Sequence, residues 1–128
     1  MTIEIPYNEL ENFINKASGR PVQVKCIGKD TVELHYIVSV KLKIAEISAQ
    51  RLLLDYSMSP IVGMMIKGMK GKVREQLHKY PFVKWIEDKE QLSIELVDIP
   101  GASSLLEHVS IHSLSFKDDH AQLILRPS

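Results

Sequence analysis

Residues 32–44 read Val-Glu-Leu-His-Tyr-Ile-Val-Ser-Val-Lys-Leu-Lys-Ile, with an apolar side chain at every even-numbered position. Successive side chains of a β-strand point to opposite faces, so this alternation indicates a strand with one apolar face and one mostly polar face. A strand of this length is more than twice the usual five or six residues. We therefore expect one long strand that coils strongly or bends at a bulge.

Shorter alternating segments lie on both sides of this stretch. They cover residues 22–26, 52–58, 82–86, 92–96, 109–116 and 121–125. In residues 109–116 the apolar positions change phase near His112 and Ser113, which predicts a β-bulge there. Short turns separate most of these segments and therefore favour antiparallel pairing.

Two segments have helical spacing instead. Pro6 suits a helix start and Gly19 a helix end, which predicts a short N-terminal helix. The second helix begins with Ser59 as N-cap and Pro60 at its first position. Apolar residues then recur every fourth position from Ile61 to Leu77. This stripe predicts one continuous amphipathic helix over residues 60–80.

Together these elements predict a single α+β domain over residues 1–128. We expect a strongly bent antiparallel sheet of about five to six strands, wrapped around the 60–80 helix and closed at one end by the N-terminal helix. The composition is 45% hydrophobic and 25% charged, which excludes a disordered chain. A single cysteine excludes a disulfide scaffold, and the net charge of zero gives no global attraction to nucleic acid.

The chain has no apolar run long enough for a membrane span, which needs about 18 residues. Its first residues carry no basic, apolar leader pattern. If Met1 is the native start, we expect a cytoplasmic protein; if a leader has been removed, we expect an exported one.

Methionine and glycine are concentrated in the 60–80 segment, which holds Met64, Met65 and Met69 beside Gly63, Gly68 and Gly71. Each glycine inside a helix costs about 1 kcal/mol relative to alanine. Either the backbone packs very closely there, or space is left for a ligand. On the second interpretation, the cavity between helix and sheet is lined by Val38, Val40, Leu42, Leu54, Tyr56, Met65, Met69, Val73 and Leu77.

The order of elements resembles the tubular lipid-binding (TULIP) superfamily, in its short bacterial branches. The resemblance lies in Tyr7-Asn8-Glu9-Leu10-Glu11-Asn12-Phe13-Ile14, in residues 94–101 (Ile-Glu-Leu-Val-Asp-Ile-Pro-Gly) and in residues 106–114. These motifs are patterns of apolar positions that extend over most of the chain. The resemblance implies a lipid as ligand.

Catalytic and metal-binding patterns are weak. His108 and His112 stand four residues apart, but the alternation around them indicates a strand and not a zinc-binding helix. Ser103 and Ser104 lack a nucleophile-elbow motif. We therefore expect no catalytic residue, no metal and no cofactor, and we expect a protein that is not an enzyme.

A basic cluster lies in the same helical segment and consists of Lys67, Lys70, Lys72 and Arg74. Gly68-Met69-Lys70-Gly71 matches the Gly-x-x-Gly loop with which KH domains clamp a nucleotide backbone. Such a loop separates two short helices, whereas the apolar stripe here favours a continuous helix. The same cluster could instead contact anionic lipid headgroups in a peripheral membrane contact, or remain solvated.

These observations predict a non-catalytic protein that binds a hydrophobic small molecule, a lipid or a fatty acyl chain. A protein–protein interaction module is the first alternative, because sheet edges invite a partner strand or a second copy in a homodimer. Nucleic-acid binding through the basic Gly-x-x-Gly segment is the alternative that the sequence favours least.

Overall fold

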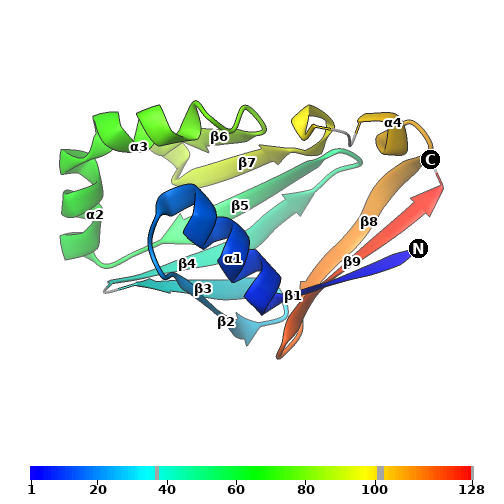
Figure 1. Ribbon diagram of the computed structural model, residues 1–128, viewed down its shortest axis with the longest axis horizontal. Coiled ribbons are helices and arrows are strands. Elements are labelled where there is room, and N and C mark those ends of the chain that lie inside the picture. The colour runs from blue at the N-terminus through cyan, green and yellow to red at the C-terminus, as the bar shows by residue number, and fades with distance from the viewer. Residues whose placement is uncertain (37, 101–102, 128) are drawn as a thin grey trace.

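The computed structural model describes residues 1–36, 38–100 and 103–127, and arranges their strands in two antiparallel sheets (Figure 1). The large sheet has the order β2 (Gln23–Gly28), β3 (Thr31–Tyr36), β4 (Val38–Ile47), β5 (Arg51–Ser57), β7 (Gln91–Glu95) and β6 (Val83–Ile86). The small sheet has the order β1 (Thr2–Pro6), β9 (His120–Pro127) and β8 (Val109–Phe116).

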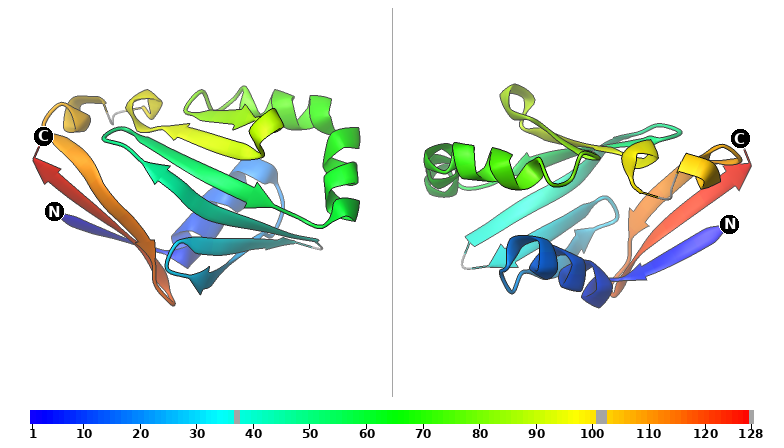
Figure 2. Two further views of the ribbon diagram at one scale, coloured as in Figure 1. Left: turned by 180° about the vertical axis from the view of Figure 1, so that it is seen from behind. Right: turned by 45° about the horizontal axis from the view of Figure 1, so that its top comes forward.

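Helices connect these strands. They are α1 (Tyr7–Ser18), α2 (Pro60–Gly68), α3 (Lys70–Leu77) and α4 (Ser103–Leu106), with single 3₁₀ turns at Glu87–Lys89 and Leu96–Asp98. Helix α1 crosses one face of the large sheet, α2 lies at the strand ends that are remote from the small sheet, and α3 runs beside β6 (Figures 1 and 2). No helix in the described ranges is long and apolar enough to cross a bilayer.

The expected sheet wrapped around one long helix is wrong, because the core lies between the two sheets. One buried cluster joins Val32 of the large sheet to Ala121 of the small sheet and to Tyr7 at the start of α1. A second cluster joins Leu52 of the large sheet to Ile111 and Leu125 of the small sheet. Apolar strand faces therefore cover one another at this end of the molecule, with Tyr7 and Leu10 of α1 packed at its edge in place of the expected long helix.

The expected long strand over residues 32–44 is also wrong. Residues 31–36 and 38–47 form two strands, β3 and β4, which pair antiparallel as a hairpin. In this register Leu34 is opposite Val40 and Val32 is opposite Leu42, so every even residue faces an even partner. The apolar alternation therefore continues unchanged through the reversal, and periodicity alone cannot distinguish a hairpin from a strand.

The expected continuous helix over residues 60–80 is divided at Met69. Ser59 is the N-cap of α2, as predicted, and its hydroxyl accepts a hydrogen bond from the Val62 amide. Met69 then leaves helical geometry, with φ −106° and ψ 13°, and α3 begins at the next residue. Gly68 and Gly71 flank the break, and glycine is a poor helix former. Two short helices thus replace the predicted long one.

Several local predictions are confirmed. Helix α1 ends at Gly19, whose φ of 70° is a left-handed C-cap that glycine adopts without a steric cost. The β8–β9 pairing shifts register between Ile111 and Ser113, which is the predicted bulge. The pattern did not reveal β1, which pairs with β9 at the edge of the small sheet. The Pro100-Gly101 pair of the 94–101 motif lies partly outside the described residues.

Candidate functional site

An open apolar groove of about 380 Å³ lies over the part of the large sheet that the small sheet does not cover. Its floor is formed by strand residues and its walls by α1, α2 and α3. The lining residues are Ile14, Val22, Leu34, Tyr36, Val38, Val40, Leu42, Tyr56, Met58, Ile66, Val73, Leu77, Trp85 and Leu92. We call this site the groove.

The β3–β4 hairpin explains why the floor is continuous. Its even-numbered residues share one face, and two of its cross-strand pairs, Leu34–Val40 and Tyr36–Val38, lie wholly within the floor. The next strand contributes Tyr56, which is opposite Leu42. Polar residues such as Lys41 and Lys43 occupy the other face of β4. The alternation that defines the strands therefore also gives one unbroken apolar surface.

The walls approach each other at one point. Phe13 of α1 packs edge-to-face against Tyr80, which follows α3, with ring centroids 6.2 Å apart. Tyr80 packs in the same manner on Phe82, at 5.9 Å. Aromatic pairs at these separations are attractive beyond the area they bury. This contact links the α1 wall to the chain segment between α3 and β6.

Six of the nine residues predicted to line a cavity line the groove, namely Val38, Val40, Leu42, Tyr56, Val73 and Leu77. The other three do not. Leu54 is buried in the sheet, opposite Ile44 and Leu92. Met65 and Met69 are 51% and 47% exposed, and the side of α2 that faces inward carries Val62 and Ile66 instead.

Sequence reasoning missed eight lining residues: Ile14, Val22, Leu34, Tyr36, Met58, Ile66, Trp85 and Leu92. A signal existed for Leu34 and Tyr36, because they belong to the same alternating set as Val38 and Val40. No local signal brings Ile14 or Trp85 to the groove, because their positions depend on how α1 and β6 dock on the sheet.

Two polar atoms of the groove are paired with each other. The Trp85 indole Nε1 donates a hydrogen bond to the Tyr56 hydroxyl over 2.9 Å. The Arg74 guanidinium lies over the Trp85 ring, 5.2 Å from its centroid, and Arg20 lies over Tyr36 at 5.8 Å. Such cation–π contacts stabilise the positions of these two aromatic rings. The remaining lining side chains are aliphatic or methionine, so the groove offers contact area with little polarity.

A more polar hollow of about 410 Å³ adjoins the groove. The two spaces share Tyr56, Met58, Ile66 and Trp85. The hollow adds polar groups that the groove lacks: Ser57, Ser59, Lys67, Glu87 and Glu90. The combined space is therefore apolar at one end and mixed at the other, where polar groups lie among Pro60 and Met64, which suits an amphiphilic molecule.

The predicted basic cluster is divided by this arrangement. Lys70 and Arg74 both contact the Glu87 carboxylate over 2.9 Å. These contacts, with the Lys70 hydrogen bond first among them, lower the pKa of Glu87 below its ordinary value. Lys67 instead lines the polar hollow, and Lys72 is exposed on α3. Two of the four predicted anion-facing residues are thus already paired.

The glycines of the 60–80 segment are not sites of close backbone packing. A Cβ atom added to Gly63, Gly68 or Gly71 would have no neighbouring atom within 4 Å. Of the two explanations offered by the sequence, close packing is therefore wrong for these positions. Gly63 borders the polar hollow and keeps that space open.

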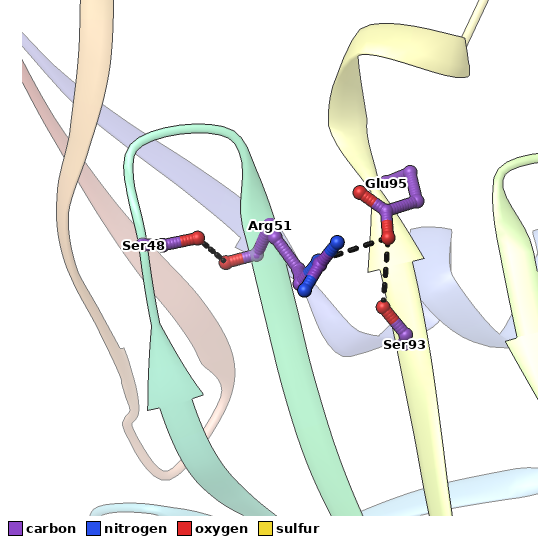
Figure 3. A network of polar contacts seen from close by, with 4 residues as sticks. All are labelled: Ser48, Arg51, Ser93 and Glu95. Carbon is purple, nitrogen blue, oxygen red and sulfur yellow. Dashed lines mark hydrogen bonds and ion pairs between the residues drawn. The ribbon is translucent and has the colours of Figure 1, made fainter. Parts of the chain in front are cut away.

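Polar clusters elsewhere link neighbouring elements. Glu95 accepts hydrogen bonds from Arg51 Nε at 2.9 Å and from the buried Ser93 hydroxyl at 3.1 Å, while the Ser48 hydroxyl donates to the Arg51 carbonyl at 3.4 Å (Figure 3). Arg51 and Glu95 are directly opposed on β5 and β7, so this network ties adjacent strands together.

The histidines do not gather into a metal site in the described ranges, where no group of three ligand-type side chains is found. His108 and His112 are exposed. His120 instead pairs with Asp119 over 2.6 Å and lies 3.9 Å from Glu4. The hydrogen bond to His120 lowers the pKa of Asp119 below its ordinary value.

Comparisons of this chain with protein-family models, with curated proteins and with solved structures find no match. The proposals below are therefore argued from the groove and its surroundings.

Proposed function

We propose that this protein binds a hydrophobic molecule of the fatty acyl or lipid type, without catalysis, in the groove. The observation that carries the proposal is an open space of about 380 Å³ lined by fourteen residues that are nearly all apolar. Its volume lies within the range of about 300–1,000 Å³ found for small-molecule sites. The adjoining polar hollow supports an amphiphile whose polar end would lie near Lys67 and Glu90.

The expected affinity follows from burial. Each methylene group transferred from water into the groove contributes about 0.8 kcal/mol, so a chain that buries twelve of them gains about 10 kcal/mol. Association costs about 4 kcal/mol or more in lost freedom. The remaining 6 kcal/mol corresponds to a Kd in the tens of micromolar, roughly.

Trp85 provides the assay, because it is the only tryptophan of the chain and lines the groove. A fatty acid that carries bromine in the middle of its chain quenches tryptophan emission on contact. We expect saturable quenching of Trp85 by this probe, and competition by the same fatty acid without bromine. Absence of quenching up to the solubility limit of the probe would refute the proposal.

Two neighbouring residues supply matched variants. Ile66 lines the groove, whereas Met65 does not line it and is 51% exposed. Ile66→Gln should raise the Kd of the brominated fatty acid about five-fold or more, because the ligand loses an apolar contact of about 1 kcal/mol or more. Met65→Gln should leave the Kd unchanged. Equal effects of the two variants would place the ligand elsewhere on the surface.

Nucleic-acid binding is a second candidate that one observation favours. The break at Met69 lies within Gly68-Met69-Lys70-Gly71 and separates two short helices between β5 and β6. The continuous helix that argued against a KH-type loop is therefore absent. A salt-dependent mobility shift of single-stranded RNA, abolished by Lys70→Asp together with Lys72→Asp, would support this candidate.

Self-association through sheet edges stays an alternative proposal, but the β2 edge is protected. The Val24 amide donates to the Glu11 carboxylate over 2.8 Å, and the Val22 amide donates to the Asn15 side chain over 2.6 Å. These α1 side chains occupy donors that a partner strand would need. The edges formed by β1, β6 and β8 are the remaining candidates. Sedimentation at two protein concentrations tests this alternative directly.

A further inference from the structure

Helix α2 is apolar on all sides. Lys67 is its only charged residue. Val62, which is 7% exposed, and Ile66, which lines the groove, face inward. On the outward side Ile61 is 73% exposed and Met64 is 74% exposed, and Met64 also borders the rim of the polar hollow. A helix that is hydrophobic all round is normally buried in a protein core or in a membrane.

The exposed apolar surface extends beyond α2. Met65 and Met69 add two more side chains that are about half exposed. We call Ile61, Met64, Met65 and Met69 the outer apolar face. It lies at the end of the molecule that is remote from the small sheet and from both chain ends (Figure 1). Described residues of this chain therefore leave this face uncovered.

The charge beside the outer apolar face indicates which kind of partner covers this face. Segment 60–77 carries four basic residues, Lys67, Lys70, Lys72 and Arg74, against Glu75 alone. Lys70 and Arg74 share Glu87, but Lys67 and Lys72 form no ion pair within the part of the chain that the structure describes. A second copy of the chain would meet the same positive charge. Four side chains are also far fewer than the twenty to thirty residues per partner in a typical stable interface, roughly.

We propose that the outer apolar face inserts into the interface of an anionic lipid bilayer, with Lys67 and Lys72 at the headgroups. Methionine and isoleucine would reach the upper part of the acyl layer, while the lysines neutralise lipid charge. The opposite side of the same helix forms a groove wall through Ile66. Docking would therefore place the groove beside the membrane. Single-stranded RNA has no need of the four apolar side chains, which favours the bilayer as partner.

The test uses the full chain and vesicles. We expect co-sedimentation with vesicles that contain about 30% phosphatidylglycerol in phosphatidylcholine, and much weaker binding to phosphatidylcholine alone. Met64→Asp should reduce partitioning about ten-fold or more, because a largely exposed side chain no longer enters the apolar layer. Lys67→Gln and Lys72→Gln should each reduce it about five-fold. Val97→Asp, at an exposed apolar position in the Leu96–Asp98 turn, is the control and should bind as wild type.

Three results would overturn the proposal. One is absence of binding to either kind of vesicle, and another is unchanged binding by Met64→Asp. The third is a concentration-dependent dimer that Met64→Asp dissociates, which would assign the face to a second copy. Docking does not depend on the acyl ligand of the proposed function. Ile66→Gln should still bind vesicles, so the failure of either proposal is recognised separately.

Discussion

An open groove predicts that a leucine-to-alanine substitution lowers the free energy of unfolding less on the groove wall than in the core. Leu125 of β9 is 3% exposed and belongs to the buried cluster with Leu52 and Ile111. Leu125→Ala removes fully buried methyl groups and leaves a cavity, so it should lower the free energy of unfolding by about 3–4 kcal/mol. That is a large part of the 5–15 kcal/mol typical of a domain, roughly.

Leu77 of α3 should respond differently. It is half-buried and borders space that is already open. Leu77→Ala therefore loses only part of the transfer free energy and creates no new enclosed cavity, and alanine is the better helix former. We expect the free energy of unfolding to fall by about 1 kcal/mol or less.

Urea unfolding followed by far-ultraviolet circular dichroism measures both variants. The dependence of the unfolding free energy on urea concentration should be unchanged, since neither variant alters the surface exposed on unfolding. An acyl ligand at ten times its Kd should stabilise the wild type and Leu125→Ala equally, by about 1.4 kcal/mol. Equal costs for the two leucines would show that the groove is closed and packed in solution, and would refute this reasoning.

The remaining predictions concern single local features, each checked by the same urea unfolding. Gly71→Ala, in open space inside α3, should stabilise the protein by up to about 1 kcal/mol, whereas Gly19→Ala should cost about 1 kcal/mol because its φ is 70°. The opposite order would contradict the assigned backbone. Ser59→Ala removes the N-cap of α2 and should cost about 1 kcal/mol; no loss would mean that α2 does not begin there. Burial, followed by the neighbouring Cys26, raises the pKa of Tyr7 above its ordinary value of 10.0. The neutral form is therefore favoured in the folded state, so stability should be full below about pH 10 and should fall above it. Tyr7→Phe should lose the hydrogen bond to the Lys117 carbonyl, cost about 1 kcal/mol at neutral pH, and flatten this alkaline loss; an unchanged alkaline slope would exclude Tyr7 as its origin.

Local periodicity located most strands but not how they are connected. Residues 32–44 alternate without a break, yet they contribute to two strands, β3 and β4, that pair antiparallel. The reversal keeps even residues opposite even residues, so the surface pattern contains no trace of it. When residues 32–44 are interpreted as one strand, the sequence predicts too few strands. One sheet is then sufficient to contain all of the predicted strands.

The helix prediction failed for a related reason. The four-step stripe from Ile61 to Leu77, widened by Val62 and Ile66, indicates one buried face. In the structure Ile61 and Met65 are exposed, and only Val62 and Ile66 of α2 face inward. Periodicity identifies an apolar side of a helix without showing which of two apolar sides packs. Helix α2 has two apolar sides, and only the tertiary structure shows which of them packs inward. The groove therefore contains most of the lining residues predicted on the strands but only Val73 and Leu77 of those predicted on the helices.

The groove follows from a mismatch in size between the two sheets. The apolar face of the large sheet extends across six strands, whereas the small sheet has three strands and packs at one end of it. At the other end, α2 and α3 are nine and eight residues long, too short to cover the floor between Leu34 and Trp85 completely. Apolar surface that is left in water costs about 25 cal/mol per Å². A ligand that covers the floor recovers this free energy without any change in the sheet, so the same deficit in packing that leaves the groove open also favours its occupation by an acyl chain.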